Sequence, residues 1–160
     1  MKGFISALVV SLVLLFATPL CKAQTKYTNT QQNFAIYVPG TVDESSSNQA
    51  SYAMVSFTGD DTLGVMVYSP NIQVPNTRET VSSIDLSDLG AYGCQDTTYH
   101  DDFARICSIN TTNNAGVKIG GKVWVDVHND YVYTVAVLVS IGTPSENSVD
   151  YYLNSFVFLK

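Results

Sequence analysis

The clearest alternation of hydrophobic and polar positions lies in the last third of the chain. Residues 122–127 and 131–140 alternate as β-strands do, and residues 128–130 between them, His-Asn-Asp, suit a tight turn. We therefore predict a long antiparallel hairpin. Its first strand places three valines on one face and Trp124, Asp126 and His128 on the other. This strand is expected to be half buried, with Trp124 at an edge or groove.

Earlier segments predict further strands. Residues 34–38 form an apolar run that Pro39 and Gly40 end, and residues 24–33 before it have the polar composition of a flexible leader. Residues 50–57 and 63–68 are rich in β-forming types, and the loop between them has the length that joins antiparallel strands. Residues 93–102 lack periodicity and are expected to form a loop.

Two segments predict helices. Between Pro75 and Gly90, apolar residues roughly mark one helical face, with Asn76 or Thr77 as the N-cap. Residues 143–146, Thr-Pro-Ser-Glu, match a capping box with proline at the first helical position. Apolar residues then recur at helical spacing to Phe156, and the apolar end of the chain is expected to dock as a terminal segment or strand. This order of elements predicts an α+β fold, an antiparallel β-sheet with a few helices packed on it, in one compact domain over residues 34–160.

Two short strings carry a resemblance to a known family. Residues 34–40, Phe-Ala-Ile-Tyr-Val-Pro-Gly, and residues 150–158, Asp-Tyr-Tyr-Leu-Asn-Ser-Phe-Val-Phe, resemble the early strand and late helix of the PsbP-like and DcrB-like exported proteins. The resemblance implies a sheet flanked by helices and a non-enzymatic accessory or binding role outside the cytoplasm. It assigns no functional residue, and the paired cysteines and the polar stretch 95–102 are not part of that pattern.

The N-terminus has the features of an export signal. Lys2 precedes an apolar run of 14 residues, 4–17, which is shorter than the roughly 20 residues that a membrane-spanning helix needs. Small residues favour cleavage after Ala23, which makes residues 1–23 a signal peptide and the protein secreted or periplasmic. Lipid attachment at Cys21 is the alternative, but Pro19 and Leu20 are poor residues before such a cysteine. We expect no membrane span after cleavage.

The charge balance limits the partners. The chain has 14 acidic and 8 basic residues, and its net charge of −6 becomes −8 without the signal peptide, which holds Lys2 and Lys22. An acidic domain without a basic cluster repels nucleic acid, so we expect an unidentified protein or small molecule as partner. Two cysteines remain after cleavage, Cys94 and Cys107. In an oxidising compartment they are expected to form a structural disulfide, with a redox pair as the alternative.

Few residues suggest chemistry. His100, Asp101 and Asp102, with Asp96, are candidate metal ligands, although neighbouring residues of an extended segment point in opposite directions and a solvated loop is the favoured interpretation. No cofactor is expected, because phosphate-binding and nucleophile motifs are absent from the sequence. Asn110 begins a glycosylation sequon that matters only in a glycosylating host.

Aromatic residues offer the remaining candidate site. Trp124, Tyr131 and Tyr133 are candidate ligand-binding residues if they line a concave face, although cross-strand packing also explains them. The sequence therefore favours a non-catalytic exported accessory or binding protein. The alternatives are a small secreted metal-dependent hydrolase using residues 96–102, and a secreted inhibitor or effector acting through a disulfide-pinned loop, residues 95–106.

Overall fold

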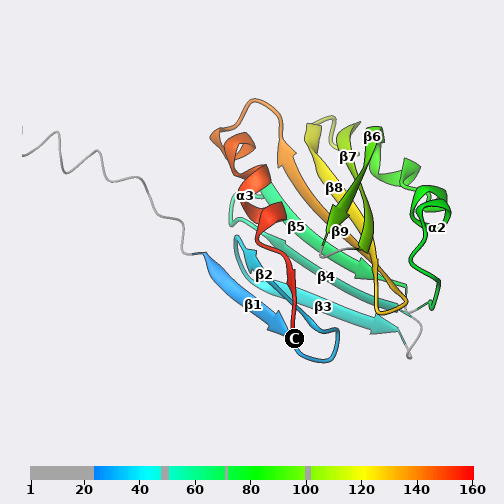
Figure 1. Cartoon of the computed structure of the whole chain (residues 1–160). Coiled ribbons are helices and arrows are strands. Elements are labelled where there is room, and N and C mark those ends of the chain that lie inside the picture. Colours follow the sequence, from blue (N-terminus) through cyan, green and yellow to red (C-terminus); the bar gives the residue numbers. More distant parts are fainter. Residues whose placement is uncertain (1–23, 48–50, 71, 100–101) are drawn as a thin grey trace, which may run out of the picture.

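An antiparallel seven-stranded sheet forms the centre of the computed structural model (Figure 1). The structure describes residues 24–47, 51–70, 72–99 and 102–160; the predicted signal peptide and the candidate ligands His100 and Asp101 lie outside them. The strands, in their order across the sheet, are β3 (Val42–Ser47), β4 (Ser51–Phe57), β5 (Leu63–Ser69), β9 (Tyr131–Ser140), β8 (Lys118–His128), β7 (Asp102–Thr112) and β6 (Ala91–Tyr99).

A second, three-stranded sheet and a helix cover one face of the large sheet, which we call the Trp124 face. The small sheet has the order β1 (Thr25–Asn29), β2 (Phe34–Val38) and β10 (Val157–Phe158), all antiparallel. It packs with helix α3 (Val149–Asn154), which follows the 3₁₀ helix η2 (Pro144–Ser148). Between these layers lies the larger hydrophobic core, centred on buried aromatic residues that include Phe34, Trp124, Tyr152 and Phe156.

Helix α2 (Arg78–Ser83) and the 3₁₀ helix η1 (Ser87–Leu89) lie on the opposite face, the Val123 face. Thr77 caps α2 as predicted, since its hydroxyl accepts a hydrogen bond from the Thr80 N–H at 3.2 Å. Val81 and Leu86 pack on the valines of β8 and on Cys107 and Ile109 of β7. In Figure 1, α3 and α2 accordingly lie at opposite sides of the molecule.

The predicted hairpin at residues 122–140 and the α+β class are confirmed. The turn at Asn129 and Asp130 has φ of 50° and 67°, a left-handed conformation that these residue types tolerate. The prediction that β8 is half buried is wrong. Both its faces are covered, because the small sheet and α3 lie over Trp124 while α2 lies over the valines.

Three local predictions also need correction. Residues 24–33 were expected to be a flexible leader, but β1 pairs with β2 from Thr25↔Val38 to Asn29↔Phe34. Residues 93–102 were expected to loop, but β6 pairs with β7, with a bulge between Tyr92 and Gln95. The capping box does not form as predicted, since the Thr143 hydroxyl donates to the Ser140 carbonyl, and a 3₁₀ helix precedes α3.

Candidate functional site

None of the helices in the described residues lies over one part of the Val123 face. The helices α2 and η1 cover the valines of β8 and the neighbouring residues of β7, whereas β4 and β5 extend beyond them. The register across β4, β5 and β9 places one set of mostly apolar side chains together on this uncovered part. We call it the open half-face: Ala53, Val55, Phe57, Gly64, Met66, Tyr68 and Leu138.

Exposed aromatic side chains mark the open half-face. Phe57 is 47% exposed and Tyr68 is 39% exposed, while Val55, Met66 and Leu138 are partly buried. A depression of about 470 Å³ lies beside Phe57, with Gly64 and Leu138 among its lining residues. Clustered exposed apolar side chains on a soluble domain commonly mark a binding surface.

The margin of the open half-face is acidic. Asp43 of β3 pairs with Val55 in register and is exposed, and Asp61 lines the depression from the β4–β5 turn. A partner with an apolar contact surface and basic residues around it would complement this arrangement.

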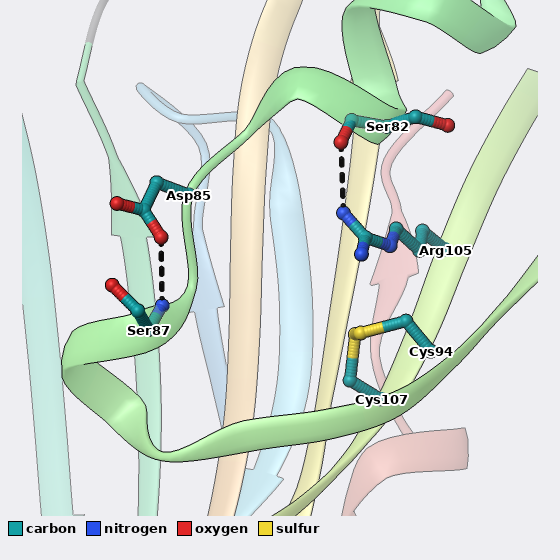
Figure 2. The surroundings of a disulfide bond; sticks show 6 residues. All are labelled: Ser82, Asp85, Ser87, Cys94, Arg105 and Cys107. Atoms are coloured by element: carbon teal, nitrogen blue, oxygen red, sulfur yellow. Dashed lines mark hydrogen bonds between the residues drawn. A yellow bond between two sulfur atoms is a disulfide. The ribbon is translucent and has the colours of Figure 1, made fainter.

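The Cys94–Cys107 disulfide joins the edge strand β6 to β7, which confirms the predicted pairing (Figure 2). Cys107 is buried under α2, whereas Cys94 is partly exposed and lines a cavity of about 370 Å³ with residues 82–87. Arg105 of β7 reaches the same segment, where its Nη1 donates to the Ser82 carbonyl at 2.9 Å. The disulfide therefore fastens an exposed edge strand to the core.

The Asp85 carboxylate orders the other end of this segment. Its Oδ1 accepts a hydrogen bond from the Ser87 N–H at 2.9 Å, which Figure 2 shows. This bond lowers the pKa of Asp85. The contact fixes the turn between α2 and η1.

The predicted metal ligands are not brought together among the described residues. Asp102 bonds with His128, with 2.9 Å between Oδ2 and Nδ1, and Asp96 forms an ion pair with Arg78 at 2.6 Å. The described part of the chain contains no group of three His, Cys, Asp or Glu side chains that could hold a metal ion. Residues 95–99 and 102–106, expected as a disulfide-pinned loop, are instead paired strands.

The predicted aromatic site lies mostly inside the core. Trp124 is 7% exposed and Tyr133 is 6% exposed, and both contact the residues that follow α3: Trp124 lies 5.3 Å from Phe156, and Tyr133 lies 4.9 Å from Phe158, between ring centroids. Tyr131 is partly buried, and its hydroxyl accepts a hydrogen bond from Gln73. These side chains do not form an exposed stacking surface. Asn110 is exposed, but it lies in β7 rather than in a turn.

A buried carboxylate is the feature that the sequence did not reveal. Asp126 is completely buried, and among the described residues neither of its oxygens has a hydrogen-bond partner. Burial, and next the charge of Asp102, raise the pKa of Asp126 to about 7. The nearby backbone N–H of Val127 lowers the pKa of Asp126 slightly, although it does not form a hydrogen bond with the carboxylate. The only sequence feature that could have indicated the burial of Asp126 is that it shares a strand face with Trp124.

Comparison with known proteins rests on solved structures. The sequence matches no protein-family model, and no curated protein matches it. The structure is similar to the solution structure of cyanobacterial PsbP (CyanoP) from Synechocystis, with 9% identity over 89% of this chain and 95% of that chain and a TM-score of 0.59. A crystal structure from Bacteroides thetaiotaomicron has 9% identity over 84% of this chain and 48% of that chain, with a TM-score of 0.53. Identities this low show the fold alone, and the fold of this chain is PsbP-like.

Proposed function

We propose that this chain is an exported, non-catalytic accessory protein that binds a protein partner through the open half-face. The observation that carries the proposal is that the exposed Phe57 and Tyr68 cluster with five further, mostly apolar residues on a part of the Val123 face that the described helices do not cover. A sheet face of this kind contributes binding energy when a partner removes it from water.

The acidic margin indicates the chemistry of the partner. Asp43 and Asp61 lie beside the apolar centre and are exposed, so basic residues around an apolar patch on the partner would pair with them. Such charges at the rim mainly increase the association rate and select the partner, while the buried aromatic contact supplies most of the affinity.

Export is supported by two independent features. Residues 4–17 form the apolar run of a signal peptide, and the Cys94–Cys107 disulfide suits an oxidising compartment. The described residues contain no helix long and apolar enough to cross a bilayer. We propose cleavage after Ala23 and release into the periplasm or outside the cell. Mass spectrometry of the mature protein would show Gln24 at its N-terminus, and an acylated Cys21 would contradict the proposal.

Site-specific cross-linking in the exporting cell tests the binding function. A photoreactive phenylalanine analogue replaces Phe57 in one variant and Tyr92 in a control, because Tyr92 is a 55% exposed aromatic residue outside the open half-face. We expect one defined adduct from position 57 and none from position 92. The yield of this adduct should decrease when Met66→Lys places a charge in the centre of the open half-face. Equal labelling from both positions would refute a specific surface.

A further inference from the structure

Asp126 is a completely buried carboxylate that has no hydrogen-bond partner among the described residues. In register, Ala104 of β7 and Tyr133 of β9 lie opposite it, and neither carries a charge. The imidazole of His128 is engaged by Asp102, and the ammonium group of Lys122, on the same strand face, is engaged by Asp150 of α3 at 2.6 Å. Buried carboxylates normally have a donor or a cation as partner, so Asp126 requires an explanation.

A cavity of about 200 Å³ lies on the same side of the sheet, and Trp124, two residues from Asp126 in β8, forms part of its wall. The walls come from β6, β7, β8, α3 and the residue Phe156 after α3. The apolar and aromatic wall residues are Tyr99, Ile106, Trp124, Leu153 and Phe156, and the exposed Thr97, Thr98 and Asn154 form the rest. The rings of Tyr99 and Trp124 meet edge to face with centroids 4.6 Å apart, and the Tyr99 hydroxyl donates to the Phe156 carbonyl at 2.5 Å. The cavity is therefore small, and hydrogen bonds and ring packing hold its aromatic walls in place.

The charge of Asp126 reaches the wall of the cavity. Trp124 is two residues away on the same face of β8, a separation of about 7 Å along a strand. Burial raises the pKa of the Tyr99 hydroxyl, and the negative charge of Asp126 raises it further. A positive charge inside the cavity would thus lie in the field of Asp126, and because that carboxylate is completely buried, water screens its charge less than it screens a surface charge.

We propose that this cavity binds a small organic ammonium ion, held by the rings of Tyr99 and Trp124 and by the negative charge of Asp126. Aromatic rings attract a cation through their electron-rich faces, and methylated ammonium ions fit apolar aromatic walls because they need few hydrogen bonds. The walls lack the set of oxygen ligands that a calcium or magnesium ion requires. The site is independent of the open half-face, which lies on the opposite side of the sheet.

The test uses the mature chain and tetramethylammonium chloride, with sodium chloride keeping the ionic strength constant. Trp124 is the only tryptophan in the chain, so its fluorescence reports on the cavity directly, and calorimetry gives the affinity. We expect saturable binding that Asp126→Asn weakens about tenfold or more. Asp88→Asn, which removes an exposed carboxylate of η1 on the other face, should leave the affinity unchanged.

A second variant and a neutral ligand keep the test decisive. Tyr99→Leu removes one aromatic wall without altering the carboxylate, and it should also weaken binding. Neopentyl alcohol resembles tetramethylammonium in shape but has no charge, so it should bind at least tenfold more weakly. The affinity should be higher at pH 8 than at pH 6, because Asp126 must be ionised when the cation is bound. Absence of saturation, equal affinity for the alcohol, or full affinity in a folded Asp126→Asn variant would overturn the proposal.

Discussion

The ring of Phe57 lies directly over Gly64, its partner across the β4–β5 hairpin. A Cβ atom built on Gly64 would lie 2.5 Å from Cε1 and 2.7 Å from Cδ1 of Phe57. The absence of a side chain at position 64 thus allows the aromatic ring to lie on the sheet. This contact positions the most exposed side chain of the open half-face.

Gly64→Ala should therefore move the Phe57 ring and destabilise the domain. Inserting a methyl group into a packed contact of this kind costs about 1–3 kcal/mol, and the ring is free to swing toward solvent, which favours the lower end. Urea denaturation followed by circular dichroism measures the loss. Binding to the cross-linked partner should also weaken, because the apolar surface changes shape.

Gly59→Ala is the matched control for this variant. It lies in the turn of the same hairpin, and a Cβ there would have no neighbour within 4 Å. We expect a change of less than about 0.5 kcal/mol, as for most surface substitutions. If Gly59→Ala and Gly64→Ala destabilised the domain equally, the ring contact would not be the cause.

Removal of the disulfide should lower stability without changing the fold. The two cysteines are 13 residues apart, and a cross-link closing a loop of this size contributes about 3 kcal/mol in the chain-entropy model. Cys94→Ala with Cys107→Ala is preferable to a serine pair, because a hydroxyl at the buried position 107 would lose its hydration. The free energy of unfolding should decrease by about 2–3 kcal/mol in the double variant.

A reducing agent provides the control for the disulfide experiment. Dithiothreitol should lower the urea midpoint of the natural sequence toward that of the double variant, and it should leave the double variant unaffected. Loss of partner binding in a double variant that is still folded would instead favour the inhibitor hypothesis for residues 95–106.

The strands that the sequence predicted are those rich in apolar, β-forming side chains. The residues of β9 are nearly all buried, and its turn with β8 has residue types that favour positive φ, so local pattern and tertiary structure agree. In β6, most side chains are exposed. Pairing with β7 and the disulfide hold β6 in place, and neither leaves a periodic signal at residues 91–99.

The candidate site was harder to predict for a related reason. An Asp between Val125 and Val127 has the pattern of a strand with one face in water, and the sequence alone does not show that the β2–β10 layer will cover it. In the open half-face the sequence misleads in the opposite direction. Val55, Phe57 and Met66 are residue types typical of a core, but the six-residue helix α2 is too short to cover them as well as the valines of β8.

Asn76, which precedes the helix-capping Thr77, should stabilise the domain through hydrogen bonds of its own side chain. Its Oδ1 accepts a hydrogen bond from the Phe103 N–H at 2.9 Å, and its Nδ2 donates to the Val127 carbonyl at 2.6 Å. The side chain thereby ties the segment before α2 to both β7 and β8. Asn76→Ala should cost about 1–3 kcal/mol in a urea titration, because the partly buried Val127 carbonyl and the exposed Phe103 N–H both lose their partner. Asn114→Ala, at an exposed turn position, should change stability little.

The buried carboxylate of Asp126 should make the domain more stable in mild acid than in mild base. Its pKa is raised from 3.8 to about 7 in the folded protein, so between these values the folded state binds a proton that the unfolded state has released. Stability contributed by the neutral form is fully present below about pH 4 and is lost as the pH rises through about 7. The difference corresponds to about 4 kcal/mol at most.

Urea denaturation between pH 5 and pH 8.5 measures this dependence, and the free energy of unfolding should fall across the range. Asp126→Asn keeps nearly the same shape without a charge, so its stability should vary far less with pH and should exceed that of the natural sequence at pH 8.5. Asp43→Asn controls for the general effect of removing one acidic residue, because Asp43 is exposed and should leave the slope unchanged. A slope that persists in Asp126→Asn would show that Asp126 is not the cause of the pH dependence.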